Sequence, residues 1–113
     1  SERAEFDDRL EINLEQDVIY CKKMPSAFFE TGLQSLCVWH QVDTLMVTGG
    51  STSGCIRATA VDSLSRGYRT VVPEECVADK HESYHFANLT DLCIKYADVL
   101  GVSEVLDWLS QQG

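Results

Sequence analysis

Long apolar runs and an excess of basic residues are both missing from this sequence of 113 residues. No stretch is long or apolar enough to cross a bilayer, and no charged-then-apolar segment opens the chain. We therefore expect neither a membrane span nor a secretory leader. Nine lysines and arginines face eighteen aspartates and glutamates, which gives a net charge of −9. That charge disfavours binding to nucleic acid or to an anionic membrane surface.

Cysteines in paired motifs are also missing. The five cysteines are scattered, and no C-x-x-C pair occurs among them. An odd number of scattered cysteines is typical of reduced thiols in a cytoplasm, and not of a disulfide framework or a zinc site. We therefore predict a cytoplasmic location, with no metal and no cofactor. Packing is expected for four of them: Cys21, Cys37, Cys76 and Cys93. For Cys76, which follows the third expected strand, a position in the lining of the site is the alternative.

The length and composition indicate one domain over residues 1–113. Hydrophobic residues make up 44% of the chain, which is typical of a globular protein. A chain of this length buries only a modest core. No internal repeat, linker or low-complexity stretch divides it.

Hydrophobic spacing predicts strands that alternate with helices after a polar lead-in over residues 1–16. The expected strands are 17–20, 43–48, 69–72 and 97–100, and the expected helices are 31–40, 53–66, 82–96 and 103–109. Strands separated by helices pair in parallel through right-handed crossovers. The order therefore predicts an α/β fold, a Rossmann-like three-layer α/β/α arrangement to which this chain supplies about four parallel strands.

Local signals predict how these helices begin, end and pack. Thr31 and Gln34 have the form of a capping box, Gly67 is placed to close the second helix, and Ser103 is placed to cap the last. The helix over 82–96 is expected to bury one stripe, formed by Phe86, Leu89, Cys93 and Tyr96.

The stretch over residues 47–55, Val-Thr-Gly-Gly-Ser-Thr-Ser-Gly-Cys, is the most informative. It predicts a strand that ends in a tight turn and restarts as a helix. Such turns lie at the carboxyl edge of an open α/β sheet, where ligands bind. Cys55 then falls in the first turn of a helix, where free N–H groups and the helix dipole favour a thiolate and a nearby oxyanion. Taken alone, a cysteine among small residues is more often a packed, inert thiol.

Several strings together resemble the isochorismatase-like cysteine hydrolases. They are Lys22-x-x-Pro-Ser-Ala-Phe-Phe-x-Thr31, Val42-Asp-Thr-Leu-x-Val-Thr-Gly49, Ser51-Thr-Ser-Gly-Cys-Ile-Arg-Ala-Thr59, Arg66-Gly-Tyr-Arg-Thr-Val-Val72 and Val77-Ala-Asp79. The similarity covers about residues 17–100. Within the family, the sequence is most similar to amidases of the N-carbamoylsarcosine type.

The resemblance implies a catalytic centre of one Asp, one Lys and one Cys. Cys55 matches the nucleophile and Lys22 matches the lysine, whereas Lys23 is one position out of register. The family's Asp ends a strand upstream of everything here, and Asp7 and Asp8 do not match its motif. The chain therefore looks like the C-terminal half of the domain. The resemblance implies an N-terminal half or a companion chain that supplies the Asp, and a homo-oligomer.

The resemblance also implies an oxyanion hole and substrate contacts. The backbone N–H groups of Ser51 and Cys55 would bind the oxyanion, with a cis peptide before Ser51. Substrate binding is expected of Thr52, Lys80 and Phe29. Lys80 occupies the position of a family arginine that meets a substrate carboxylate, although a surface lysine is the alternative.

A pair of histidines, His81 and His85, has the i, i+4 spacing that can bind a metal. No third ligand is evident in the sequence. We therefore favour a surface histidine and a partly buried one over a metal site.

The implied function is the release of ammonia from a small linear amide or an N-carbamoyl amino acid, through a thioester on Cys55. Amides of the maleamate or nicotinamide type are the alternative substrates. Lys80 mildly favours a substrate with a carboxylate. A non-catalytic half-domain that needs a companion chain is the alternative function.

Overall fold

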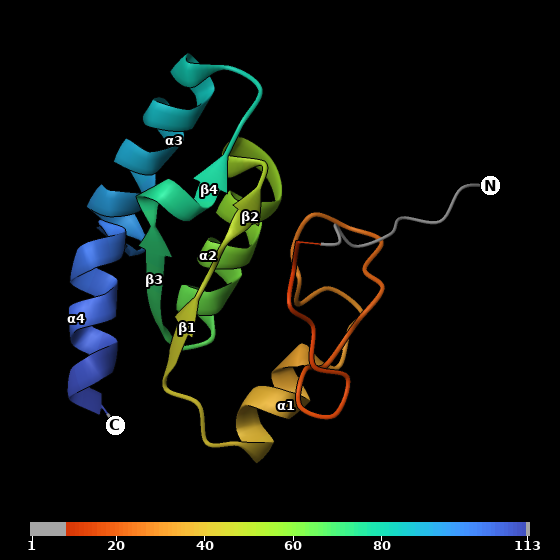
Figure 1. Ribbon diagram of the computed structural model, residues 1–113. Coiled ribbons are helices and arrows are strands. Elements are labelled where there is room, and N and C mark those ends of the chain that lie inside the picture. Colours follow the sequence, from red (N-terminus) through yellow and green to blue (C-terminus); the bar gives the residue numbers. More distant parts are fainter. Residues whose placement is uncertain (1–8, 113) are drawn as a thin grey trace.

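The computed structural model describes residues 9–112, so Asp7 and Asp8 lie outside the described residues. The strands are β1 (Thr44–Met46), β2 (Gly49–Gly50), β3 (Arg69–Pro73), β4 (Val77–Ala78) and β5 (Asp98–Leu100). The α-helices are α1 (Leu33–Trp39), α2 (Arg57–Ser65), α3 (Glu82–Lys95) and α4 (Val102–Gln112). A π-helical turn, η1 (Thr52–Ile56), precedes α2, and a 3-10 turn, η2 (Glu74–Cys76), separates β3 from β4 (Figure 1).

Parallel pairing holds all of these strands together. The main sheet has the order β1-β3-β5, and β2 pairs with β4 in a short extension beyond it. Helices α2 and α3 make the two crossovers of the main sheet (Figure 1). The predicted α/β fold with a parallel sheet is confirmed, and three of the four expected strands are present as β1, β3 and β5.

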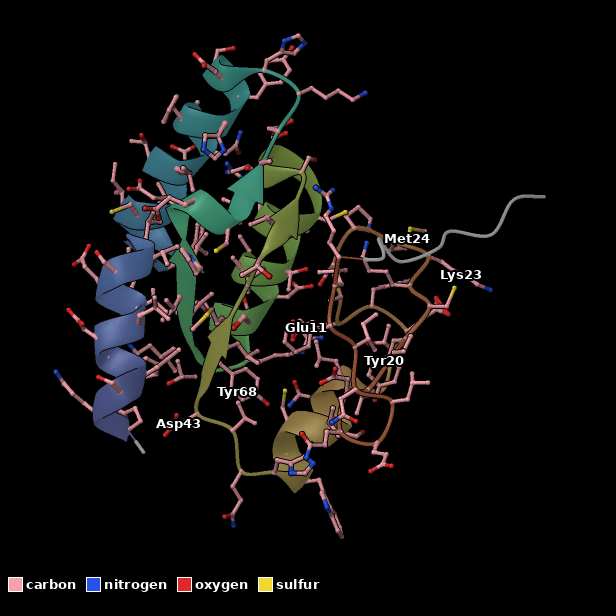
Figure 2. The ribbon with its side chains drawn as sticks, viewed as in Figure 1. Glu11, Tyr20, Lys23, Met24, Asp43 and Tyr68 are labelled. Atoms are coloured by element: carbon pink, nitrogen blue, oxygen red, sulfur yellow. The ribbon has the colours of Figure 1, made fainter. Side chains whose placement is uncertain are left out.

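The expected strand over residues 17–20 does not form. Within residues 9–112 this segment pairs with no strand, and Val18, Ile19 and Tyr20 are about half exposed, at 54%, 47% and 44%. Figure 2 shows Tyr20 in the N-terminal loop, apart from the sheet. A strand is stable only when its backbone pairs with a neighbour, and an apolar run by itself does not reveal whether that neighbour exists.

Two of the three predicted helix signals are wrong. Thr31 Oγ1 donates to the Ala27 carbonyl at 2.5 Å and Gln34 Nε2 donates to the Tyr68 hydroxyl at 3.1 Å, so no capping box forms. Ser103 lies inside α4, whose first amides are bound by carboxylates of Glu75 and Glu104. A side chain from a distant segment can cap a helix, and local sequence does not report it.

The prediction for Gly67 is confirmed. It follows Arg66, the C-cap residue of α2, and adopts a φ of +89°, a conformation that glycine reaches without steric cost. The Gly67 N–H donates to Leu64 O at 2.9 Å and the Tyr68 N–H donates to Ser63 O at 3.1 Å. These bonds satisfy the last carbonyls of α2 and turn the chain into β3.

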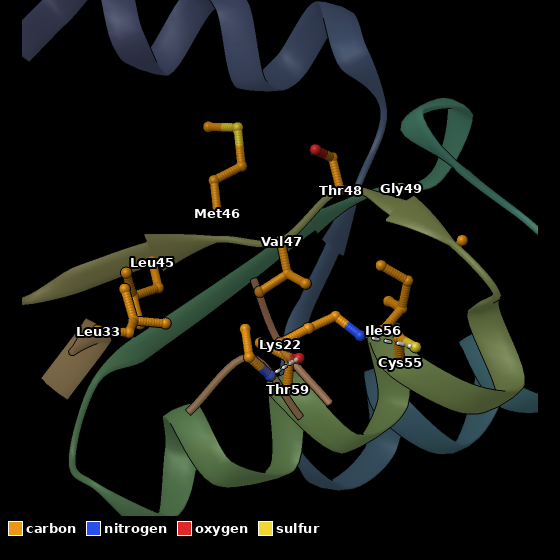
Figure 3. Close-up of a pocket in the computed structure, with 12 residues that line it drawn as sticks. Lys22, Leu33, Leu45, Met46, Val47, Thr48, Gly49, Cys55, Ile56 and Thr59 are labelled. Atoms are coloured by element: carbon orange, nitrogen blue, oxygen red, sulfur yellow. Dashed lines mark hydrogen bonds between the residues drawn. The ribbon is translucent and has the colours of Figure 1, made fainter. Parts of the chain in front are cut away.

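Helices cover both faces of the sheet. Helices α2 and α3 lie together on one face, and α4 lies on the other (Figure 3). The larger core fills the space between the sheet, α2 and α3: Val47, Ile56, Ala60, Val72, Val77, Leu89 and Leu92. A smaller cluster joins the loop before α1 to the start of β3: Phe28, Cys37 and Tyr68.

The buried stripe of α3 is rotated from the predicted one. Leu89 is buried and Tyr96 packs partly buried against the core, as expected, but Phe86 is 59% exposed and Cys93 is exposed, and Leu92 is buried in their place. The packed side of α3 also carries the polar His85, which faces η1. Hydrophobic spacing cannot locate a packed face that includes polar residues.

The expectations for the cysteines are only partly correct. Cys37 is buried in the smaller cluster, as predicted. Cys21, Cys76 and Cys93 are exposed, so the prediction that they pack in the core is wrong. Cys21 directly follows the segment that lacks its expected strand, and Cys93 is exposed because the buried stripe of α3 is rotated away from it.

No helix within residues 9–112 has the length and apolar character needed to cross a membrane.

Replacing Leu92 by alanine tests the placement of the core. Leu92 projects from α3 into the larger core and is fully buried there. Leu92→Ala is therefore expected to lower the free energy of unfolding by roughly 2–5 kcal/mol. The matched control is Ile94→Ala on the same helix, where the side chain is 72% exposed and a change within about 0.5 kcal/mol is expected. Urea denaturation measures both, and equal effects would show that α3 packs by another face.

Candidate active site

The turn that carries Cys55 begins where β2 ends. The Gly50–Ser51 peptide is cis, as the resemblance implied. The N–H groups of Gly54 and Ile56 both donate to the Ser51 carbonyl at 3.1 Å, and the chain winds into the π-helical turn η1. The helix predicted from Ser53 therefore begins as a wider turn and becomes α-helical only at Arg57.

Cys55 lines an open cavity of about 370 Å³ beside β1 and β2 (Figure 3). Cys55 is partly exposed, so it is not fully packed in the core. The other lining residues are mostly apolar or small: Ala27, Leu33, Leu45, Met46, Val47, Thr48, Gly49, Gly50, Ile56 and Thr59. Lys22 completes the lining and is the only charged residue among the described residues that form it.

The Lys22 ammonium lies against the sulfur of Cys55. Its Nζ donates to Cys55 Sγ at 3.3 Å and to the carbonyl of Met24 at 3.2 Å (Figure 3). A positive charge at hydrogen-bond distance favours the thiolate form of a cysteine, which is the nucleophilic form. The sequence motifs alone placed these two residues together, and the structure brings them into contact.

A short loop with two buried residues, Ser26 and Phe28, holds Lys22 in this position. The Ala27 N–H donates to Thr59 Oγ1 on α2 at 2.9 Å, which ties the loop to the helix that follows Cys55. Phe28 is 4% exposed and stacks on Tyr68, with ring centroids 6.3 Å apart, and the Arg66 guanidinium lies over the Phe28 ring at 4.5 Å from its centroid. The Pro-Ser-Ala-Phe string after Lys22 therefore has a structural role in fixing the ammonium.

The three predicted substrate contacts do not line this cavity. Phe29 is 47% exposed, and Lys80 is exposed in a separate hollow beside α3. Thr52 is fully buried, with its hydroxyl 2.9 Å from Nδ1 of His85. Of the predicted site residues, the structure thus brings together Lys22 and Cys55, with Ser51 adjacent in the same turn.

Two residues outside the predicted set hold the Cys55 turn. Asp79 Oδ2 accepts the Ser53 N–H at 2.8 Å, and His85 lies against Thr52. Hydrogen bonds from the hydroxyl and the amide of Ser53 lower the pKa of Asp79 below its ordinary value. Asp79 ends the Val-Ala-Asp string of the resemblance, which was the available signal, whereas no sequence signal linked His85 to this turn.

The pair of histidines makes other contacts. The ring of His81 packs edge-on against Tyr84 with centroids 5.0 Å apart, while His85 bonds to Thr52. Among residues 9–112, no three His, Cys, Asp or Glu side chains are grouped closely enough to hold a metal ion.

Comparison with known proteins places this site in a family. The sequence profile of the Isochorismatase domain matches residues 1–104. The chain belongs to the isochorismatase family. An isochorismatase-like hydrolase from Alkaliphilus metalliredigens has the same fold, with a TM-score of 0.88 and 30% identity over 93% of this chain and 57% of that one.

Two curated relatives of this isochorismatase-family chain are amidohydrolases. Maleamate amidohydrolase of Pseudomonas putida is 46% identical over 93 residues, which are 82% of this chain and 44% of that protein. N-carbamoylsarcosine amidase of an Arthrobacter species is 33% identical over 106 residues, which are 94% of this chain and 40% of that protein. The chain thus spans less than half the length of either relative.

The contact between Lys22 and Cys55 predicts a difference between two adjacent lysines. Lys22→Gln is expected to slow alkylation of Cys55 by iodoacetamide at neutral pH by several-fold, up to about tenfold. Hydrogen bonds to charged groups contribute roughly 1.5–3 kcal/mol, and exposure of Lys22 to solvent reduces that value. Lys23 points away into solvent (Figure 2), so Lys23→Gln is the matched control and should leave the rate unchanged. Peptide mapping reads Cys55 separately from the other cysteines, and equal rates in both variants would contradict the contact.

The lowered pKa of Asp79 predicts a pH-dependent contribution to stability. A carboxyl group with a lower pKa in the folded state stabilises the fold above its unfolded pKa, ordinarily 3.8, and that contribution is lost as the pH falls through the folded value. The difference in free energy of unfolding between the wild type and Asp79→Asn should therefore be constant near neutral pH and shrink in acid. Urea denaturation as a function of pH measures it, and a difference that grows in acid would contradict the assignment.

Proposed function

We propose that this chain carries the nucleophile and the ammonium group of a cysteine-dependent amidohydrolase. The reaction releases ammonia from a small linear amide or an N-carbamoyl amino acid, through a thioester on Cys55. The observation that supports this most strongly is the 3.3 Å contact of Lys22 Nζ with Cys55 Sγ at the wall of an open cavity.

In the first step the Cys55 thiolate attacks the carbonyl carbon of the amide. A C–S bond forms, and the π electrons of the carbonyl move to its oxygen. The backbone N–H groups of Ser51 and Cys55 are the proposed donors to this oxyanion. A single donor of this kind contributes roughly 3 kcal/mol to the stability of the transition state.

In the second step the C–N bond breaks and the nitrogen takes up a proton to leave as ammonia. Water then hydrolyses the thioester and restores the thiol. Both steps need a group that gives and takes a proton, and the described residues that line the cavity include no carboxylate. We propose that the general acid and base is an Asp from a companion chain or an N-terminal half. The remaining length of the curated relatives is consistent with such a source.

Two substrate types fit the proposal. N-carbamoyl amino acids and maleamate both combine a terminal –CO–NH₂ group with a carboxylate, and a cavity of about 370 Å³ accommodates molecules of this size. The 46% identity to maleamate amidohydrolase makes a maleamate-type amide the second candidate. Lys22 is the only charged residue among the described residues of the cavity lining. A second cation for the carboxylate would therefore come from the same companion or from movement of Lys80.

The test measures ammonia release by the purified protein, alone and with any polypeptide that copurifies with it. N-carbamoylsarcosine, maleamate and nicotinamide form the substrate panel. Cys55→Ala is expected to abolish release of ammonia from every substrate while the unfolding transition is retained, because no thioester can form. Cys93→Ala, which removes an exposed cysteine on α3, is the matched control and should keep full activity.

Ammonia release that survives in Cys55→Ala would reject the covalent route. No ammonia release by the wild type under either condition would favour the alternative of a non-catalytic half-domain. Preferred turnover of nicotinamide, which has no carboxylate, would reject the proposed substrate class.

A further inference from the structure

We infer that His85 is a positioning residue, which holds the Cys55 turn at contact distance from Lys22 by binding the buried hydroxyl of Thr52. This inference rests on the proposed role of Cys55 as a nucleophile. It adds a part of the site that lies on α3, outside the cavity.

The bond between Thr52 and His85 joins two distant parts of the chain. Thr52 is 0% exposed and His85 Nδ1 lies 2.9 Å from its hydroxyl, across 33 positions of sequence. A buried hydroxyl that loses its partner costs roughly as much as the desolvation of that group, so the bond is a strong constraint on the turn. The ring of His85 is itself packed against Phe86, with centroids 5.0 Å apart.

Three further interactions hold the turn and the start of α2 that follows it. The Ser53 N–H donates to Asp79 Oδ2 at 2.8 Å, directly after Thr52. Beyond the cysteine, Arg57 Nη1 donates to Asn88 Oδ1 on α3 at 2.6 Å and pairs with Asp91 at 3.2 Å. Hydrogen bonds to α3 are therefore made by residues on both sides of Cys55, Thr52 before it and Arg57 after it. Of these two residues, Thr52 is the one that is fully buried.

The lysine is held by other elements. Lys22 precedes the loop that Thr59 of α2 and the Phe28 cluster fix in place, and neither of these contacts involves α3. Loss of the His85 bond therefore releases the sulfur while the ammonium keeps its place. Hydrogen bonds weaken steeply beyond their optimal distance, so a small displacement of the turn is enough to lower the reactivity of the thiol.

Paired substitutions on the full chain test this inference. His85→Leu removes the polar ring and Thr52→Val removes the hydroxyl with little change of shape. His85→Asn and Thr52→Ser keep a polar atom at each end of the bond. His40→Leu, a change at an exposed histidine after α1, is the matched control. The readout is the rate of Cys55 alkylation by iodoacetamide at neutral pH, resolved by peptide mapping, and urea denaturation confirms that each variant is folded.

The expected result is a slowing of about five- to tenfold in both His85→Leu and Thr52→Val, because a small misplacement of a reacting group is costly. The double variant should be no slower than either single one, since both remove the same bond. His85→Asn, Thr52→Ser and His40→Leu should remain close to the wild type.

Additive effects in the double variant, or normal alkylation in folded His85→Leu, would overturn the inference. A failure of the proposed function gives a different pattern. In that case the wild-type Cys55 would react no faster than the exposed Cys93. Alkylation needs no amide substrate, so the two outcomes are distinguishable.

Discussion

A single contact, between the ammonium of Lys22 and the sulfur of Cys55, organises the part of the molecule described here. The two residues are 33 positions apart and meet at 3.3 Å. Neither side chain is held by its own neighbours in sequence alone. Thr59 and the Phe28–Tyr68 stack fix the loop that follows Lys22, while contacts to Asp79 and α3 fix the turn that carries Cys55. The site is therefore the meeting point of two separately anchored segments.

The parallel sheet explains why these anchors converge. Gly49 and Gly50 of β2 pair in register with Val77 and Ala78 of β4, so the residues that follow each strand emerge at the same edge. The Cys55 turn follows β2 and Asp79 follows β4, which brings the carboxylate to the amide of Ser53. Backbone pairing thus positions the turn independently of the side chains of the site. The site lies at the carboxyl edge of the sheet, where open α/β sheets bind ligands.

Hydrophobic periodicity was sufficient to predict α2, α3 and the parallel strands of the main sheet, and the position of Gly67 predicted where α2 ends. Periodicity failed for residues 17–20, because a strand depends on a neighbour that an apolar run does not reveal. In the site, the motifs that contain Lys22 and Cys55 predicted their contact. The bond between Thr52 and His85 could not be predicted, because it depends on the burial of a hydroxyl and on the rotation of α3, and neither leaves a local pattern.

A crystal structure is the most direct test of the contact between Lys22 and Cys55. The Lys22 Nζ should lie within hydrogen-bond distance of the Cys55 Sγ, close to the 3.3 Å found here, with the sulfur open to the cavity beside β1 and β2. A Lys22 side chain that turns away into solvent, or a Cys55 sulfur closed off from the cavity, would contradict the central role of this contact.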